Sequence, residues 1–151
     1  MRILRVLVVL SSLGGLFVAC GGDPEPIPVE NAGSACTNVS QCYPGLDGGT
    51  LKGAAQCLTK VTGGYCTHLC TTDADCCAVP GECTQNFKQV CAPFESTGQM
   101  MCFLSCEDAT VQVESSDYAG NTTGFCQAYA NAAFGCRSTG GGAKNRKVCL
   151  P

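Results

Sequence analysis

The chain of 151 residues contains no tryptophan, and its aromatic side chains are limited to six Phe and four Tyr. Charged residues are also scarce, at 14% of the sequence. With so few large apolar side chains, little apolar area can be buried per residue, while conformational entropy opposes folding strongly. The composition therefore indicates that the fold needs a source of stability other than a hydrophobic core.

Histidine occurs once, as His68, and the sequence has neither a Gly-x-Ser-x-Gly motif nor a pair of histidines at metal-ligand spacing. The common hydrolase constellations are therefore unsupported. Cys-x2-Cys is also absent, which argues against a zinc ribbon and a thioredoxin-like redox motif. His68 lies between Cys66 and Cys70, but we expect those thiols to be oxidised and hence not to bind metal. We predict no enzyme, no metal site and no cofactor.

The chain also has no dense basic stripe, and its formal net charge is −3. This balance argues against nucleic acid as a partner. Near the C-terminus lies a group of cations, which we interpret as a solvated basic tail, with contact to an anionic surface as the alternative. Its members are Arg137, Lys144, Arg146 and Lys147.

The one long apolar run extends from Val6 to Val18 and follows the basic residues Arg2 and Arg5. A basic start, an apolar stretch and a small residue before the cut are typical of a secretory signal peptide. The run ends in Leu-Phe-Val-Ala-Cys-Gly-Gly at residues 16–22, so that the cut would fall directly before Cys20. We therefore expect residues 1–19 to be removed on export.

Ala19-Cys20-Gly21 at the end of an apolar segment resembles the lipobox of bacterial lipoproteins. That resemblance implies acylation of Cys20 and anchoring in a membrane. Because Gly21, and not Asp, follows the cysteine, it also implies the bacterial outer membrane. A secreted form without lipid and an uncleaved anchor are the alternatives. Several acyl chains would make the anchoring stable, whereas a single chain is marginal.

Cysteine is abundant, with 15 residues, and an odd number is awkward for an exported chain. If Cys20 is lipidated, the remaining cysteines suffice for seven disulfides, each contributing roughly 3 kcal/mol for a 15-residue loop. We therefore expect a disulfide scaffold, formed in an oxidising compartment. The cysteines concerned are Cys36, Cys42, Cys57, Cys66, Cys70, Cys76, Cys77, Cys83, Cys91, Cys102, Cys106, Cys126, Cys136 and Cys149.

The order of motifs predicts three parts after the signal peptide. Residues 20–35 would be the lipidated cysteine and a tether, because Pro24, Pro26 and Pro28 favour extended geometry. Residues 36–106 would form two divergent cysteine-rich repeats, since Cys36-x5-Cys42 and Cys70-x5-Cys76 share their spacing. Residues 107–151 would be a cysteine-containing C-terminal extension.

The expected fold class is a small, disulfide-rich, irregular β-rich module with short hairpins and one short C-terminal helix. Hairpin signals occur at 55–58 with 65–67, and at 82–84 with 89–91. The alternation at 110–113 predicts a strand, helical spacing predicts a helix at 126–134, and 147–149 is expected to be a terminal strand.

The run from Cys66 to Cys91 contains the adjacent pair Cys76-Cys77 and resembles the spacing of an inhibitor cystine knot. That resemblance implies the pairs Cys66–Cys77, Cys70–Cys83 and Cys76–Cys91. It would make residues 80–82 and 86–88 a contact loop.

Acidic residues in the same stretch, Asp73, Asp75 and Glu82, have the oxygen ligands that Ca²⁺ prefers. We favour the simpler interpretation that these carboxylates accept local backbone hydrogen bonds in a turn.

The function expected from these observations is a membrane-anchored, exported lipoprotein that presents a disulfide-stabilised binding or structural module. Its ligand would be a protein or an envelope polymer. A knottin-like inhibitor or toxin-like effector is the alternative.

Overall fold

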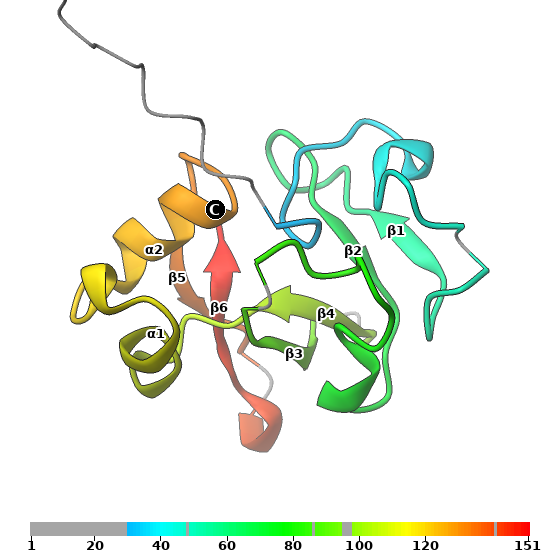
Figure 1. Cartoon of the computed structure of the whole chain (residues 1–151). Helices are drawn as coiled ribbons and strands as arrows, with labels where there is room; N and C mark the ends of the chain where they lie inside the picture. Colours follow the sequence, from blue (N-terminus) through cyan, green and yellow to red (C-terminus); the bar gives the residue numbers. More distant parts are fainter. Residues whose placement is uncertain (1–29, 48, 86, 95–97, 141) are drawn as a thin grey trace, which may run out of the picture.

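The computed structural model of the chain describes residues 30–47, 49–85, 87–94, 98–140 and 142–151 (Figure 1). The predicted signal peptide, Cys20 and most of the predicted tether lie outside these residues. Among the described helices, none has the length and apolar composition needed to cross a membrane.

Three antiparallel hairpins form the framework. Each hairpin is a separate two-stranded sheet, and each sets two cysteines opposite one another in register: Cys57 and Cys66, Cys91 and Cys102, Cys136 and Cys149. The predicted class, a small disulfide-rich and irregular β-rich fold, is therefore confirmed. The strands are β1 (Ala55–Cys57) with β2 (Cys66–His68), β3 (Gln89–Pro93) with β4 (Met100–Leu104), and β5 (Gly135–Ser138) with β6 (Lys147–Leu150).

Six of the seven disulfides follow one rule, which divides the module into three units. In each unit the first cysteine pairs with the third and the second with the fourth, and the third and fourth lie on the hairpin. The pairs are Cys36–Cys57 and Cys42–Cys66 in unit 1, Cys70–Cys91 and Cys76–Cys102 in unit 2, and Cys106–Cys136 and Cys126–Cys149 in unit 3. The seventh, Cys77–Cys83, closes a short loop inside unit 2. The C-terminal part, interpreted from sequence as an extension, thus has the same pattern as the two repeats.

Neighbouring units are joined in the same way at both junctions. Leu69, just before unit 2, forms a β-bridge with Met101, and Ser105, just before unit 3, forms one with Val148. In each case the bridged partner directly precedes the fourth cysteine of the following unit. As a result, β2, β4 and β6 follow one another across the module (Figure 1).

The segment between the first two cysteines of each unit is where the units differ. In units 1 and 2 it holds a single 3-10 turn, η1 (Val39–Gln41) and η2 (Asp73–Asp75). In unit 3 it is longer and contains α1 (Asp108–Glu114), η4 (Ser116–Tyr118) and the first half of α2 (Thr122–Tyr129). A last 3-10 turn, η5 (Gly142–Lys144), lies between β5 and β6.

Two strand predictions were wrong. Residues 110–113 belong to helix α1, in which Val111 is fully buried while Val113 is 85% exposed. An alternation of polar and apolar residues over only four positions fits one turn of a helix as well as a strand, so the alternation alone could not distinguish the two. Residues 82–84 form no strand, because β3 pairs with β4.

The predicted single helix at 126–134 is also corrected, since the described residues form two α-helices and α2 begins earlier. The side chain of Asn121 accepts a hydrogen bond from the backbone N–H of Gly124, which caps α2 at its N-terminus. The predicted strands at 55–58, 65–67 and 147–149 correspond to β1, β2 and β6.

The main apolar core lies between units 2 and 3 and includes two side chains of unit 1, Val61 and Tyr65. The fully buried ring of Tyr65 stacks on Phe134 with centroids 5.6 Å apart and lies 5.4 Å from Phe103. One aromatic side chain of unit 1 thus contacts both other units. The few aromatics of the chain are concentrated where the units meet.

The turn of the first hairpin gives a test of this packing, because Gly63 and Gly64 both have positive φ. A Cβ at Gly64 would overlap the backbone carbonyl of Cys36, whereas a Cβ at Gly63 would meet open space. We expect Gly63→Ala to cost about 1 kcal/mol from backbone conformation alone. Gly64→Ala adds a steric clash, for a total of about 3 kcal/mol. Urea unfolding of both variants measures the difference, and equal losses would contradict the close approach.

Candidate functional site

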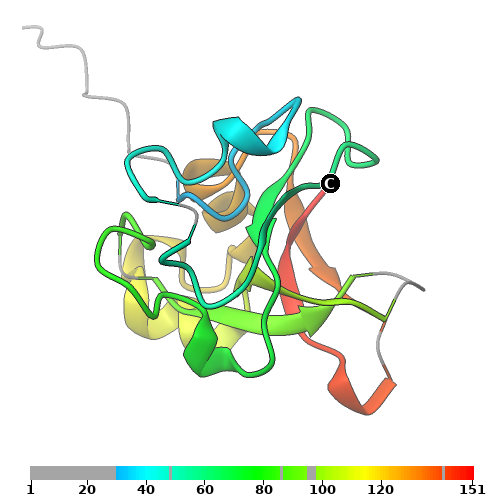
Figure 2. The ribbon, with the colours of Figure 1, turned by 90° about the vertical axis from the view of Figure 1, so that its right-hand side faces the viewer.

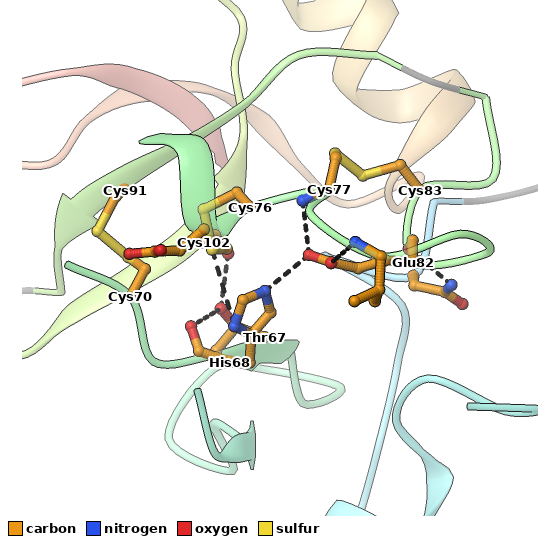
Figure 3. A network of polar contacts seen from close by, with 12 residues as sticks. Thr67, His68, Cys70, Cys76, Cys77, Glu82, Cys83, Cys91 and Cys102 are labelled. Carbon is orange, nitrogen blue, oxygen red and sulfur yellow. Dashed lines mark hydrogen bonds and ion pairs between the residues drawn. A yellow bond between two sulfur atoms is a disulfide. The ribbon is translucent and has the colours of Figure 1, made fainter. Parts of the chain in front are cut away.

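A buried ion pair joins unit 1 to the loop of unit 2 (Figure 3). His68 ends β2, and its Nε2 lies 2.8 Å from Oε1 of Glu82, with both side chains fully buried. On the other side of the ring, Nδ1 lies 2.8 Å from the carbonyl oxygen of Leu69. Each ring nitrogen therefore faces an oxygen atom, so that both nitrogens are occupied within the fold.

Glu82 is held by its own loop as well. Its carboxylate accepts hydrogen bonds from the backbone N–H groups of Cys77 (2.6 Å) and Val79 (3.2 Å). The Cys77–Cys83 disulfide closes the same loop around it (Figure 3). A buried charge needs such partners, because desolvation of an unpaired carboxylate is costly. The ion pair fixes the unit 2 loop against unit 1 and has no exposed edge for a substrate.

Equivalent positions in units 1 and 2 have a strained backbone beside this pair. Tyr43 and Cys77 each follow the second cysteine of their unit, and their φ values are +55° and +62°. Such angles are uncommon for residues other than glycine. The ring of Tyr43 lies edge-on to that of His68, at 5.6 Å between centroids, and burial raises the pKa of its hydroxyl. The left-handed turn thus directs Tyr43 into the junction.

The start of the described chain binds to the same loop. Glu30 is fully buried, and its carboxylate accepts from the backbone N–H groups of Thr84 (2.8 Å) and Gln85 (2.5 Å). Burial raises the pKa of Glu30, and this effect exceeds that of the backbone hydrogen bonds, which lower the pKa. Asn31 donates to the carbonyl oxygens of Gly81 and Glu82. Residues 30–35, assigned from sequence to the tether, therefore pack as part of the module.

The knot pairing is overturned, because Cys66 pairs with Cys42, Cys70 with Cys91, and Cys76 with Cys102. The contact loop implied by it is corrected in part: Pro80, Gly81 and Lys88 are exposed, but Glu82 is fully buried and Phe87 is 8% exposed, while residue 86 lies outside the described residues.

The acidic residues considered for Ca²⁺ have partners within the fold. Asp75 accepts hydrogen bonds from the backbone N–H groups of Thr71 (2.7 Å) and Thr72 (2.8 Å), and the second of these is the largest cause of its lowered pKa. These are the local hydrogen bonds that we favoured from sequence. Asp73 differs, because it accepts from the backbone N–H of Cys91 and pairs with Arg146, which both lie far along the chain. Cys66 and Cys70, considered with His68 as metal ligands, are both in disulfides.

The predicted basic tail forms part of an ordered hairpin. Arg146 bridges two acidic side chains of the neighbouring segments, with Nη1 2.9 Å from Asp73 Oδ2 and Nε 2.7 Å from Glu107 Oε1. The hydrogen bond from Arg146 lowers the pKa of Glu107. Lys147 pairs with Asp108 at 3.2 Å in a largely exposed position. Arg146 therefore attaches the β5–β6 hairpin to the module.

A cavity of about 250 Å³ opens beside this hairpin, where the three units meet. Lys60 and Thr62 line it from the β1–β2 turn, Phe94 from the end of β3, and Ser138 and Leu150 from the β5–β6 hairpin. Sequence reasoning did not single out Lys60, because nothing in the sequence shows that its turn meets the third hairpin.

The fully buried His68–Glu82 pair was also missed. His68 and Glu82 were each considered separately, as a candidate metal ligand and a candidate calcium ligand, but local sequence gave no reason to pair them.

Comparison with known proteins found no matching family model, no matching curated protein and no matching solved structure. The class that the fold and its contacts define is a disulfide-rich, β-rich module of three covalently closed units.

Proposed function

We propose that the protein is an exported, lipid-anchored lipoprotein whose disulfide-stabilised module binds an extracytoplasmic ligand. The observation that carries the proposal is the pairing of all fourteen cysteines from Cys36 to Cys149 with one another. This leaves the fifteenth cysteine, Cys20, without a partner inside the chain. A free thiol at the end of a signal-like segment is the group that lipidation requires.

The disulfides also support export. Reducing conditions in a cytosol oppose stable disulfides, and this module depends on seven of them. In the proposed arrangement, residues 21–29 connect the anchor to the packed module, which begins at Glu30. We place the anchor in the bacterial outer membrane because Gly21 follows the lipidated residue.

A binding role fits the chemistry of the module better than catalysis does. The single histidine of the chain is fully buried and occupied on both ring nitrogens. Among the described carboxylates, Asp73, Asp75, Glu82 and Glu107 accept hydrogen bonds within the fold. The surface is therefore presented by rigid loops without a visible catalytic group, and a protein or an envelope polymer would be its ligand.

Substitution of Cys20 by serine tests the anchor. We expect Cys20→Ser to abolish incorporation of labelled fatty acid and to shift the protein from the membrane to the soluble fraction, because serine lacks the thiol that is acylated. Metabolic labelling and membrane fractionation measure both effects. The matched control is Cys77→Ser/Cys83→Ser, which alters cysteines but leaves position 20 intact and should retain the label. Unchanged membrane partitioning of Cys20→Ser would reject the lipoprotein, and release of unlabelled wild-type protein would favour a secreted form.

A further inference from the structure

The cations of this acidic chain are unevenly placed. After Asp117 the sequence contains no acidic residue, while Arg137, Lys144, Arg146 and Lys147 all lie in or near the β5–β6 hairpin. Arg146 is engaged by two carboxylates, but the exposed Arg137 and Lys144 form no ion pair with a described residue. The hairpin therefore retains positive charge that the module itself does not neutralise.

The turn of this hairpin is held in one conformation by its own side chains. Oδ1 of Asn145 accepts hydrogen bonds from the hydroxyl of Ser138 (2.6 Å) and the backbone N–H of Gly140 (3.2 Å). The backbone N–H of Thr139 donates to the carbonyl oxygen of Arg146 (3.0 Å), and the Thr139 hydroxyl accepts from the Arg146 N–H (3.1 Å). Such preorganisation reduces the entropic cost of binding a ligand.

A third unpaired cation lies across the cavity from this hairpin. Lys60 is exposed in the β1–β2 turn, forms no ion pair within the described chain, and lines the 250 Å³ cavity together with Ser138. We define the hairpin-turn face as residues 59–62, the cavity that they help to line, and the described residues of the β5–β6 turn, 138–140 and 142–147. In Figure 2 the β1–β2 turn, the C-terminus and the β5–β6 turn lie along the right-hand side, while the described chain begins on the opposite side.

We propose that the hairpin-turn face binds an acidic polysaccharide, with Lys60 and Lys144 contacting its carboxylates. The proposal rests on the proposed function and specifies its ligand. Positive charge on a rigid hairpin complements a polyanion. The cavity is smaller than the pockets of about 300–1,000 Å³ that enclose a whole small ligand, so that it suits one residue of a longer chain. Its lining combines an aromatic residue, Phe94, with the hydroxyl-bearing residues Thr62, Ser138 and Thr139, a composition that suits a sugar ring.

A protein partner and the membrane surface fit the hairpin-turn face less well than a polysaccharide does. Stable protein interfaces are centred on buried apolar side chains. The exposed large hydrophobic side chains among the described residues, Val39 and Val113, lie on η1 and α1, outside the hairpin-turn face. The membrane that holds the anchor would lie toward the chain start, on the other side of the module (Figure 2). A polymer outside that membrane is therefore the ligand that the face favours.

Retention on immobilised polygalacturonate tests the proposal with the full chain, purified in detergent with its disulfides intact. We expect the protein to bind this polymer but not neutral dextran, and to elute as salt screens the charges. The double variant Lys60→Gln/Lys144→Gln should bind about tenfold more weakly. Lys52→Gln, which removes an exposed cation outside the cavity, is the matched control and should bind as the wild type does.

Absence of binding to polygalacturonate, or equal binding by the double variant, would overturn the proposal. Equally tight binding to polyglutamate or single-stranded DNA would also overturn it, because the face would then recognise charge alone. Fatty-acid labelling of Cys20 in the same preparation distinguishes failure of the ligand proposal from failure of the proposed lipoprotein function. If the protein is labelled but does not bind the polymer, the ligand proposal fails and the lipoprotein proposal is retained. If the protein binds the polymer but is not labelled, the lipoprotein proposal fails and the ligand proposal is retained.

Discussion

Replacement of His68 by leucine is expected to destabilise the folded protein by about 3–5 kcal/mol, because it leaves the Glu82 carboxylate buried without its cation. Both side chains are fully buried. Of the four ion pairs among the described residues, this one is fully enclosed. Chemical denaturation under oxidising conditions measures the loss, with the disulfides present in both states.

Lys147→Gln is the matched control for that experiment. It removes a cation from the Lys147–Asp108 pair, whose side chains are 57% and 69% exposed. Exposed pairs of this kind contribute about 0–1 kcal/mol, so the expected change is small. A loss in His68→Leu as small as that of Lys147→Gln would show that the buried pair does not hold the unit 2 loop against unit 1.

Removal of the Cys76–Cys102 disulfide is expected to have the second large effect. This bond spans 26 residues and forms part of a buried cluster with Cys91, whereas Cys77–Cys83 spans 6 residues. On the chain-entropy relation, the long loop contributes about 3.5 kcal/mol and the short loop about 2.2 kcal/mol. The double variant Cys76→Ala/Cys102→Ala should therefore unfold more easily than Cys77→Ala/Cys83→Ala.

Thermal unfolding of the two double variants measures this order, and disulfide mapping of the wild type checks its basis. Mapping should yield a peptide that links Cys76 to Cys102. A peptide linking Cys76 to Cys91 would contradict the three-unit pattern and restore the knot. The reverse order of stability would show that the short loop around Glu82 matters more than its length suggests.

Much of the first two units could be predicted from the spacing of the cysteines. The five-residue gap after Cys36 and after Cys70 indicated two related units, and the turn at Gly63-Gly64 marked the first hairpin. In unit 2 the adjacent cysteines suggested a knot that ends at Cys91, so that Cys102, which lies opposite Cys91 on the hairpin, was left out of the unit. Spacing alone does not show which cysteines share a hairpin.

The third unit was hidden by the helices between its first two cysteines. Residues 107–125 take the place of a five-residue gap, so that no repeat of the spacing is visible even though Cys136 and Cys149 pair in register as in the other units. The His68–Glu82 pair and the burial of Glu30 depend on contacts between units. Local propensity carries no information about such contacts.

The disulfide pattern has a consequence for proteolysis. Within each unit, any single backbone cut between the first and fourth cysteine leaves the two fragments covalently attached, because at least one disulfide spans the cut. Between the units, the stretches without this protection are 67–69 and 103–105. In them Thr67, His68, Phe103, Leu104 and Ser105 are fully buried, and Leu69 and Ser105 pair with the next unit. Between the units, the chain is thus least accessible to an attacking peptidase where a nick would separate it into pieces.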